Sequence, residues 1–222
     1  MAGGVDPRRL GTPLPGPLGP GLRIAEGARR HPALAGVVTA YIVAWCMYGL
    51  AAGSRNTASY VVTVAVLALA IAAADARIHF SMVVLVGLAV WGFGHLAGGL
   101  VGLEGPGDRI LYNAVFLRWG HFDNVVHAIG FGTSGIAVWE STRSWLPAEP
   151  GHPLGTAMVV CLLGQGVGAF NEVIEFWSTH LLAETNVGGY ENTGRDLVAN
   201  LLGSVVAGWW VSRRPVRRPA GG

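Results

Sequence analysis

The chain has 222 residues, of which 51% are hydrophobic and 13% are charged, and its formal net charge is +2. Soluble domains carry roughly a quarter charged residues, so this composition argues against an ordinary soluble protein. The small net charge, without a basic stripe of interleaved aromatic residues, argues against a nucleic-acid partner. The composition therefore favours a protein whose partner is the lipid bilayer.

The first 32 residues are rich in proline, glycine and arginine. Such a segment lacks the apolar surface that would offset the entropy cost of ordering, so residues 1–32 are predicted to form a disordered cytoplasmic tail. Residues 33–211 follow as a predicted transmembrane domain, and residues 212–222 as an arginine-rich cytoplasmic tail.

A helix that crosses a bilayer needs roughly 20 apolar residues, with about 17–25 common. Six segments meet or approach this length, and no period-2 alternation suggests a barrel. The predicted spans are residues 33–52, 57–74, 80–101, 123–140, 154–177 and 196–211, of which the fourth and sixth are short. The predicted fold is an all-α integral membrane bundle of six transmembrane helices.

The placement of arginine predicts the orientation, because cytoplasmic segments of membrane proteins are enriched in positive residues. With the N-terminus inside, 11 of the 15 basic residues, all of them arginine, fall on the cytoplasmic side. Six spans return the arginine-rich C-terminus to that same side. We therefore expect a multi-pass protein of the cell inner membrane with both termini in the cytoplasm.

Small residues recur four apart along two of the predicted spans, at Gly94 and Gly98, Gly98 and Gly102, and Gly164 and Gly168. This spacing lets helix backbones approach closely. Packing between helices of one chain is the favoured interpretation, and a homodimer interface is the alternative.

Polar residues near the spans fall into groups spaced three or four apart, which places each group on one helix face. The groups are Asp123 with His127, Glu172 with Glu175 beside Asn171, Asp196 with Asn200, and the single His95. The third and fifth spans end, and the fourth and sixth begin, on the same side of the membrane. All these groups are therefore predicted to reach one membrane face, which the arginine pattern makes the extracytoplasmic one.

Carboxylates in or beside the hydrocarbon layer cost roughly 2.5–3.5 kcal/mol each on insertion scales, so they usually pair or mark a site. One interpretation is a divalent-metal site, zinc or manganese, with the ligands His95, Asp123, His127, Glu175 and Asp196. Another is metal-free acid/base chemistry by Glu172, Glu175 and His127. A third is a hydrogen-bonded structural cluster that closes the end of the bundle.

Two further features lie beside these groups. Arg195 could bind a phosphate through two hydrogen bonds, and the alternative is an ion pair with a neighbouring carboxylate. Residues 185–194 form a glycine-rich turn segment carrying Tyr190, which would overhang the polar groups as a lid or as an ordinary surface loop. Tyr190, Arg195 and Asn200 are therefore candidate substrate-binding residues.

Over roughly residues 80–210, the order of these motifs resembles the YjdF type of small bacterial inner-membrane proteins. The motifs are His95-x-x-Gly98-Gly99, Phe122-Asp123-x-x-x-His127, Asn171-Glu172-x-x-Glu175-Phe176-Trp177 and Gly194-x-Asp196-x-x-x-Asn200. The last part is also similar to VanZ-like proteins, which are associated with glycopeptide-antibiotic resistance. The chain departs from the YjdF-type pattern at Phe122, where tyrosine is common, and at Arg195, where tryptophan is common. The resemblance implies the fold and the residue set rather than a reaction.

The leading hypothesis is a polar site on the extracytoplasmic face that holds a divalent cation and binds or acts on a lipid or cell-envelope intermediate. In an enzyme, Glu172 or Glu175 would be the general base, His127 a ligand or acid, and Arg195 a phosphate anchor. The alternative hypothesis is a non-catalytic membrane protein whose polar cluster is structural or relays protons or ions. Whether the chain is an enzyme stays open between the two.

Overall fold

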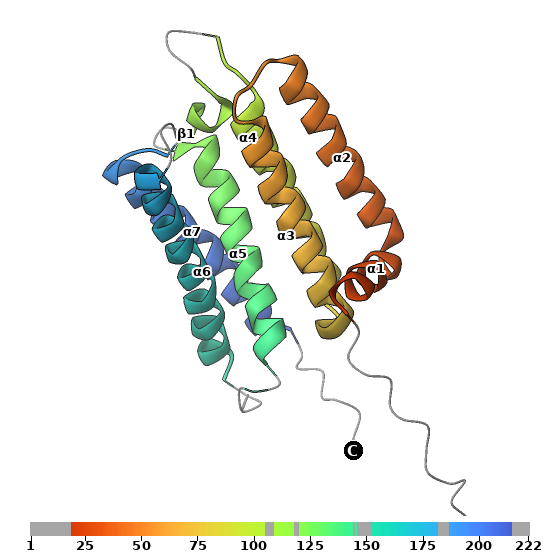
Figure 1. The fold of residues 1–222 in the computed structure, drawn as a ribbon. Coiled ribbons are helices and arrows are strands. Elements are labelled where there is room, and N and C mark those ends of the chain that lie inside the picture. Colours follow the sequence, from red (N-terminus) through yellow and green to blue (C-terminus); the bar gives the residue numbers. More distant parts are fainter. Residues whose placement is uncertain are drawn as a thin grey trace, which may run out of the picture.

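The computed structural model describes residues 19–104, 109–117, 120–143, 145, 152–181 and 187–214. Within these ranges the chain is a bundle of helices, with a short hairpin and one 3₁₀ turn between α4 and α5 (Figure 1). The helices are α1 (Pro20–Arg30), α2 (Pro32–Ala51), α3 (Thr57–Ile78), α4 (Met82–Leu100), α5 (Phe122–Thr142), α6 (Pro153–Leu181) and α7 (Tyr190–Ser212). The short elements are the 3₁₀ turn η2 (Leu111–Asn113) and the antiparallel strands β1 (Val115–Leu117) and β2 (Gly120–His121).

Helices α2 to α7 lie where the six spans were predicted, so the all-α fold is confirmed. In the described part of the chain, four helices, α2, α3, α4 and α6, are long and apolar enough to cross a membrane. Helices α5 and α7 have 21 and 23 residues, but they carry two and three buried polar side chains, which lower their mean hydropathy. The chain therefore has several membrane-type helices, and α5 and α7 differ from them in polarity rather than in length.

Helix α1 occupies part of the segment for which the sequence predicted disorder. Its residues 20–30 pack across the end of α3, where a side chain at Gly27 would collide with the backbone of Ala72. Arg30 Nη1 also donates to the backbone carbonyl of Asp75 at 2.5 Å. The ordering of α1 thus depends on its contact with α3, which the composition of residues 1–32 does not reveal. The rest of that predicted tail, residues 1–18, and residues 215–222 of the C-terminal tail lie outside the described residues.

Helix α7 also begins earlier than predicted, at Tyr190 instead of Asp196. The added turn is supported by two side-chain pairs four residues apart, Asn192 with Asp196 and Glu191 with Arg195. Such pairs face each other on a helix and stabilise it. Of the predicted glycine-rich turn, residues 185 and 186 lie outside the described residues.

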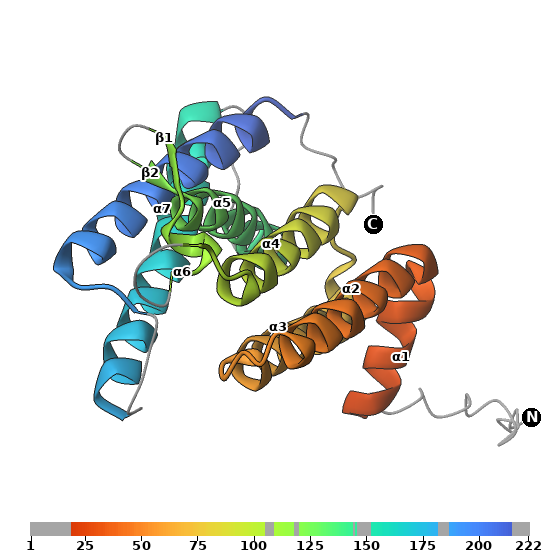
Figure 2. The same cartoon turned by 90° about the horizontal axis from the view of Figure 1, so that it is seen from above.

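Seen from above (Figure 2), α1, α2 and α3 form one group, α5, α6 and α7 form another, and α4 lies between them. The second group is packed through glycines. Gly132 of α5 faces the backbone of Gly203 on α7, while Gly164 and Gly168 of α6 face Ser204 and Asn200 of α7. The predicted spacing of Gly164 and Gly168 therefore serves packing within one chain.

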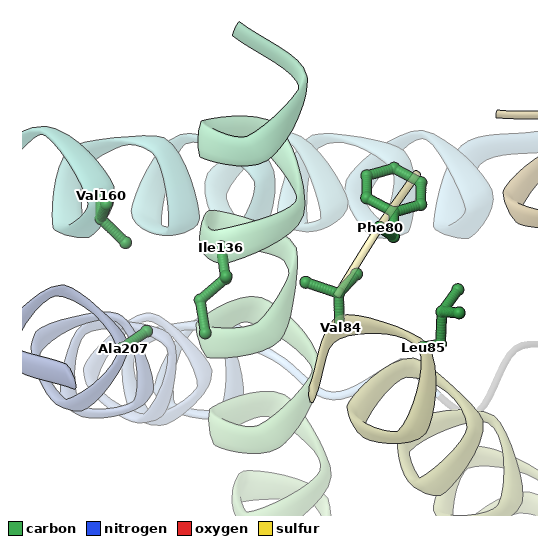
Figure 3. Close-up of a cluster of buried hydrophobic side chains, with 6 residues drawn as sticks. All are labelled: Phe80, Val84, Leu85, Ile136, Val160 and Ala207. Atoms are coloured by element: carbon green, nitrogen blue, oxygen red, sulfur yellow. The ribbon is translucent and has the colours of Figure 1, made fainter. Parts of the chain in front are cut away.

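A hydrophobic cluster joins α4 to the second group (Figure 3). Its buried members are Phe80, Val84, Leu85, Ile136, Val160 and Ala207. At the same end of the bundle, the backbone N–H of Ser81 donates to Glu140 Oε2 at 2.8 Å, which ties the start of α4 to the end of α5. These contacts fix the position of α5 along its helix axis, and they therefore set the position of the side chains at its other end.

Candidate functional site

Helix α5 presents Asp123 and His127 from its first two turns. The helix begins after His121, whose backbone N–H donates to Asn124 Oδ1 at 2.8 Å, a capping contact that fixes where the helix starts. The four-residue spacing brings His127 Nε2 to 3.6 Å from Asp123 Oδ1. His127 is only 7% exposed, so its imidazole ring lies inside the bundle.

Helix α7 contributes Asp196, which is 0% exposed. Its carboxylate accepts hydrogen bonds from two asparagines. Asn124 Nδ2 donates to Oδ1 at 2.8 Å, and Asn192 Nδ2 donates to Oδ2 at 2.5 Å. These bonds hold the Asp196 carboxylate in one orientation and leave each oxygen with further lone-pair capacity.

A second α7 residue, Asn200, orients His127. Asn200 Oδ1 lies 3.1 Å from His127 Nδ1, and an amide oxygen only accepts, so Nδ1 carries the proton of this hydrogen bond. In a neutral imidazole the other nitrogen, Nε2, then keeps its lone pair. That lone pair is on the side that faces Asp123, as a metal ligand or a proton acceptor requires.

Helix α6 adds two glutamates from its last third. Glu175 accepts a hydrogen bond from Asn171 Nδ2 at 2.7 Å. Glu172 is 8% exposed, its Oε1 lies 3.8 Å from His127 Nδ1, and neither of its oxygens has a hydrogen-bond partner among the described residues. A buried ionised carboxylate without partners is costly. Glu172 therefore requires a proton, a cation or a polar ligand beyond these side chains.

Two overlapping groups of metal-ligand side chains meet at His127. One is Asp123, His127 and Asp196, and the other is His127, Glu172 and Glu175. Within each group the ligand atoms lie within 4.8 Å of one another, and a bound zinc would draw such atoms in to about 2.0–2.2 Å from itself. Residues from three helices, far apart in sequence, thus converge at the end of the bundle near the hairpin, as the alternation of crossings predicted.

A sequence model of the family described as "Predicted membrane protein (DUF2238)" matches residues 33–217. The chain belongs to the DUF2238 family. This is the YjdF-like family that the ordered motifs resemble, and no finding supports the further likeness to VanZ-like proteins. No curated protein and no solved structure matches the chain.

In this DUF2238 chain His95, predicted as a metal ligand, belongs to neither of the two ligand groups found among the described residues. Its Nδ1 is hydrogen-bonded at 2.6 Å to the hydroxyl of Tyr112. The ring stacks on Trp91 at 5.2 Å between centroids and packs against Tyr60 at 5.1 Å. The Tyr112 ring in turn lies where a side chain at Gly98 would be, which gives the His95-x-x-Gly98 motif a packing role.

Tyr112 links the loop before α5 to the polar groups. Partial burial raises the pKa of its phenol well above its usual value of 10.0, and the nearby carboxylates of Asp123, Glu175 and Asp196 raise the pKa further. The phenol is therefore neutral at ordinary pH and keeps its hydrogen-bond donor. Tyr112 is a neighbour of the site that the sequence analysis did not identify.

The structure also places the three predicted substrate-binding residues. Tyr190 is 94% exposed at the first position of α7 and is not part of the buried cluster. Arg195 pairs with Glu191 and lies 3.2 Å from His121 Nδ1, so the predicted alternative of an ion pair with a carboxylate is the one observed. Asn200 is 0% exposed, so it is inaccessible to a substrate and acts on His127 instead.

Two asparagines in this DUF2238 chain were missed by the sequence analysis, Asn124 and Asn192. Both donate a hydrogen bond to Asp196. Each is close in sequence to a predicted ligand, since Asn124 follows Asp123 directly and Asn192 precedes Asp196 by four residues. A metal ligand is commonly held by such a surrounding layer of hydrogen bonds. Asparagine at helical spacing from a candidate ligand is the signal that could have found them.

Proposed function

We propose that this chain is a six-span protein of the cell inner membrane that binds a divalent cation at Asp123, His127 and Asp196. The single observation that carries the proposal is the orientation of His127. His127 Nδ1–H donates a hydrogen bond to Asn200 Oδ1, and the free Nε2 faces Asp123. Metal-bound histidines are usually oriented in this way, with the second ring nitrogen donating to an acceptor.

The donor set favours a hard or borderline ion. Asp123 and Asp196 offer carboxylate oxygens and His127 offers one imidazole nitrogen, a combination suited to zinc or manganese. Three protein ligands leave coordination positions for water or a substrate oxygen. When bound, the cation would supply charge stabilisation and lower the pKa of a bound water.

Glu172 is the candidate general base beside this site. It is buried, its oxygens lack hydrogen-bond partners among the described residues, and it approaches the protonated nitrogen of His127 rather than Nε2. A carboxylate in that position is suited to take a proton from a reacting group. With Asn171 as its partner, Glu175 is the better candidate for a further cation ligand or for orienting the group bound there.

We further propose that the site faces the extracytoplasmic side, at the depth of the lipid headgroups, and takes a lipid or cell-envelope intermediate as substrate or ligand. The support is the position of the cluster at one end of the bundle, near the last third of the membrane-type helix α6, together with the excess of arginine near both termini. Arg195, paired with Glu191 at the same end, would have to exchange that partner before it could bind a phosphate.

The test is metal analysis of the purified full-length protein, followed by binding of Mn²⁺ and Zn²⁺ to metal-stripped samples. We expect close to one ion per chain, and His127→Ala or Asp123→Asn to weaken binding by more than about 100-fold, beyond the effect of removing a surrounding hydrogen bond. His180→Ala, a histidine at the exposed end of α6, is the matched control and should bind as the wild type does. Stoichiometry well below one ion, unaffected by His127→Ala, would remove the proposal.

A second candidate is a structural polar network without a cation. The observation in its favour is that Asp196 has both oxygens hydrogen-bonded by asparagines, so it is stable as it stands. This candidate predicts that Glu175→Gln, which keeps an acceptor for Asn171, preserves the fold and any phenotype, whereas Glu175→Leu lowers thermal stability. The cation proposal, in which Glu175 is a candidate further ligand, predicts weaker ion binding in both variants.

A further inference from the structure

The other half of the bundle contains a cavity of about 180 Å³, bordered by α1, α2, α3 and α4. Its walls are mostly apolar, with contributions such as Val38, Ala68 and Leu88. Helix α2 is correspondingly loosely packed, since Gly49 is the only one of its 20 residues that is buried. An apolar cavity of about 150 Å³ stays dry and accepts a benzene-sized apolar molecule. This space therefore suits an apolar group better than water.

One end of the cavity is polar, and its polar atoms are incompletely bonded. Asp75, which is 1% exposed, and His31 both line it. The backbone N–H of Phe80 donates to Asp75 Oδ1 at 2.8 Å. Asp75 Oδ2 lies 3.4 Å from Arg30 Nη1 and 3.6 Å from His31 Nε2. Neither Oδ2 nor His31 Nε2 has a hydrogen-bond partner among the residues that the structure describes, although both atoms are buried.

We propose that this cavity binds a neutral lipid with a hydroxyl headgroup, of the monoacylglycerol class, with the hydroxyl between Asp75 and His31. At about 180 Å³ the cavity holds the part of the acyl chain nearest the headgroup, and the rest of the chain lies in the bilayer. A hydroxyl both donates and accepts, so a single group can satisfy the carboxylate oxygen and the imidazole nitrogen. The positive charge of Arg30 is already opposed by Asp75, so the headgroup needs no charge of its own. The surrounding bilayer can supply such a lipid, because α2, α3 and α4 are membrane-type helices.

This lipid site is independent of the proposed cation site. Asp123 lies at the start of α5, whereas Glu140, near the end of the same helix, bonds to Ser81 close to Asp75 in the chain. The two sites therefore lie toward opposite ends of the bundle, and variants at one do not touch the ligands of the other.

The experiment measures retention of radiolabelled monoolein on the detergent-purified full-length protein, with methyl oleate as a matched ligand that lacks the hydroxyls. We expect about one monoolein per chain and about fivefold weaker binding of methyl oleate, the effect of one lost hydrogen bond. Ala35→Phe places a ring in the cavity and should reduce binding at least about tenfold, whereas Ala40→Phe, on the same helix outside the cavity wall, should not.

Ala68→Phe fills the same space from α3 and serves if Ala35→Phe does not fold, as judged by gel filtration and helical content. Equal retention by the wild type and the filled variants overturns the proposal, and so does equal retention of the two ligands. No retention by the wild type also overturns it. The cation-binding assay on His127→Ala tests the other site separately, so each failure can be assigned.

Discussion

A close helix contact between α5 and α7 allows a sharp test of how these two helices hold the candidate site together. A Cβ atom at Gly203 would lie well inside 3.0 Å of the backbone carbonyl of Ala128. That neighbour is main chain and cannot turn aside as a side chain could. Gly203→Ala should therefore push α5 and α7 apart next to His127 and Asn200, which are one and three residues from the contact.

The expected magnitude comes from two opposing effects. Glycine to alanine inside a helix gains about 0.5–1 kcal/mol of stability from backbone entropy. Overpacking costs about 1–3 kcal/mol. With a rigid backbone partner the upper part of that range applies, so Gly203→Ala should lose about 1–2 kcal/mol net.

Gly194→Ala is the matched control, because Gly194 is on the same helix and a Cβ there would have nothing within 4 Å. It should gain stability, by about 0.5 kcal/mol or more. Denaturation of both variants in detergent, with cation affinity measured on the same samples, gives the comparison. If Gly203→Ala is as stable as Gly194→Ala, or binds cations as tightly as the wild type, the close approach of α5 and α7 does not position the site.

Two further predictions concern the hydrogen bonds around the site. Asn200→Ala should weaken cation binding by about 10–100-fold in a competition assay, because His127 loses the acceptor that fixes its Nδ1 proton, and unchanged affinity would argue against that role. Tyr112→Phe should destabilise the fold by about 1 kcal/mol through the lost bond to His95. The pKa of Tyr112 is raised above its unfolded value of about 10, so its contribution is complete below that pH and disappears as pH rises through the folded pKa. Above about pH 10 the wild type should therefore lose more stability than the variant, which lacks the contribution of this phenol.

Helix positions could be predicted from the sequence because a bilayer leaves few alternatives to apolar helices of about 20 residues. The predicted end of a span was wrong where a charged residue has a partner far away in the sequence. The second span was predicted to end at residue 74, yet α3 continues to Ile78. A hydropathy pattern treats Asp75 as the end of a span, and it cannot show that Arg30, 45 residues away, bonds to that same residue.

The convergence of the site could also be predicted, because residue spacing decides which side chains share a helix face and the number of crossings decides which ends meet. The hydrogen-bond partners could not. Asn124 reaches Asp196 across 72 residues, and this depends on how far each helix is rotated about its own axis. Likewise Tyr112, in the loop before α5, is hydrogen-bonded to His95, which the sequence analysis grouped with the metal ligands.

The polarity of α7 has a bearing on the number of spans, because its polar residues and its exposed residues lie on different faces. Asp196, Asn200 and Ser204 are all 0% exposed, so they are covered by other helices. The large exposed side chains from residue 198 onward are apolar: Val198, Leu201, Leu202, Val205, Val206 and Trp209. Its 23 residues span about 35 Å at about 1.5 Å per residue, enough for a hydrocarbon layer of about 30 Å.

Mean hydropathy averages the two faces of α7, whereas lipid contacts only the outer one, so we expect α7 to cross the membrane. In a chain with Cys46 and Cys161 replaced by alanine, Tyr190→Cys should react with a membrane-impermeant maleimide from outside the cell. Ser212→Cys, at the other end of α7, should react only after the membrane is permeabilised. Labelling of both cysteines from the same side would mean that α7 does not span, and the prediction that both tails lie in the cytoplasm would fail with it.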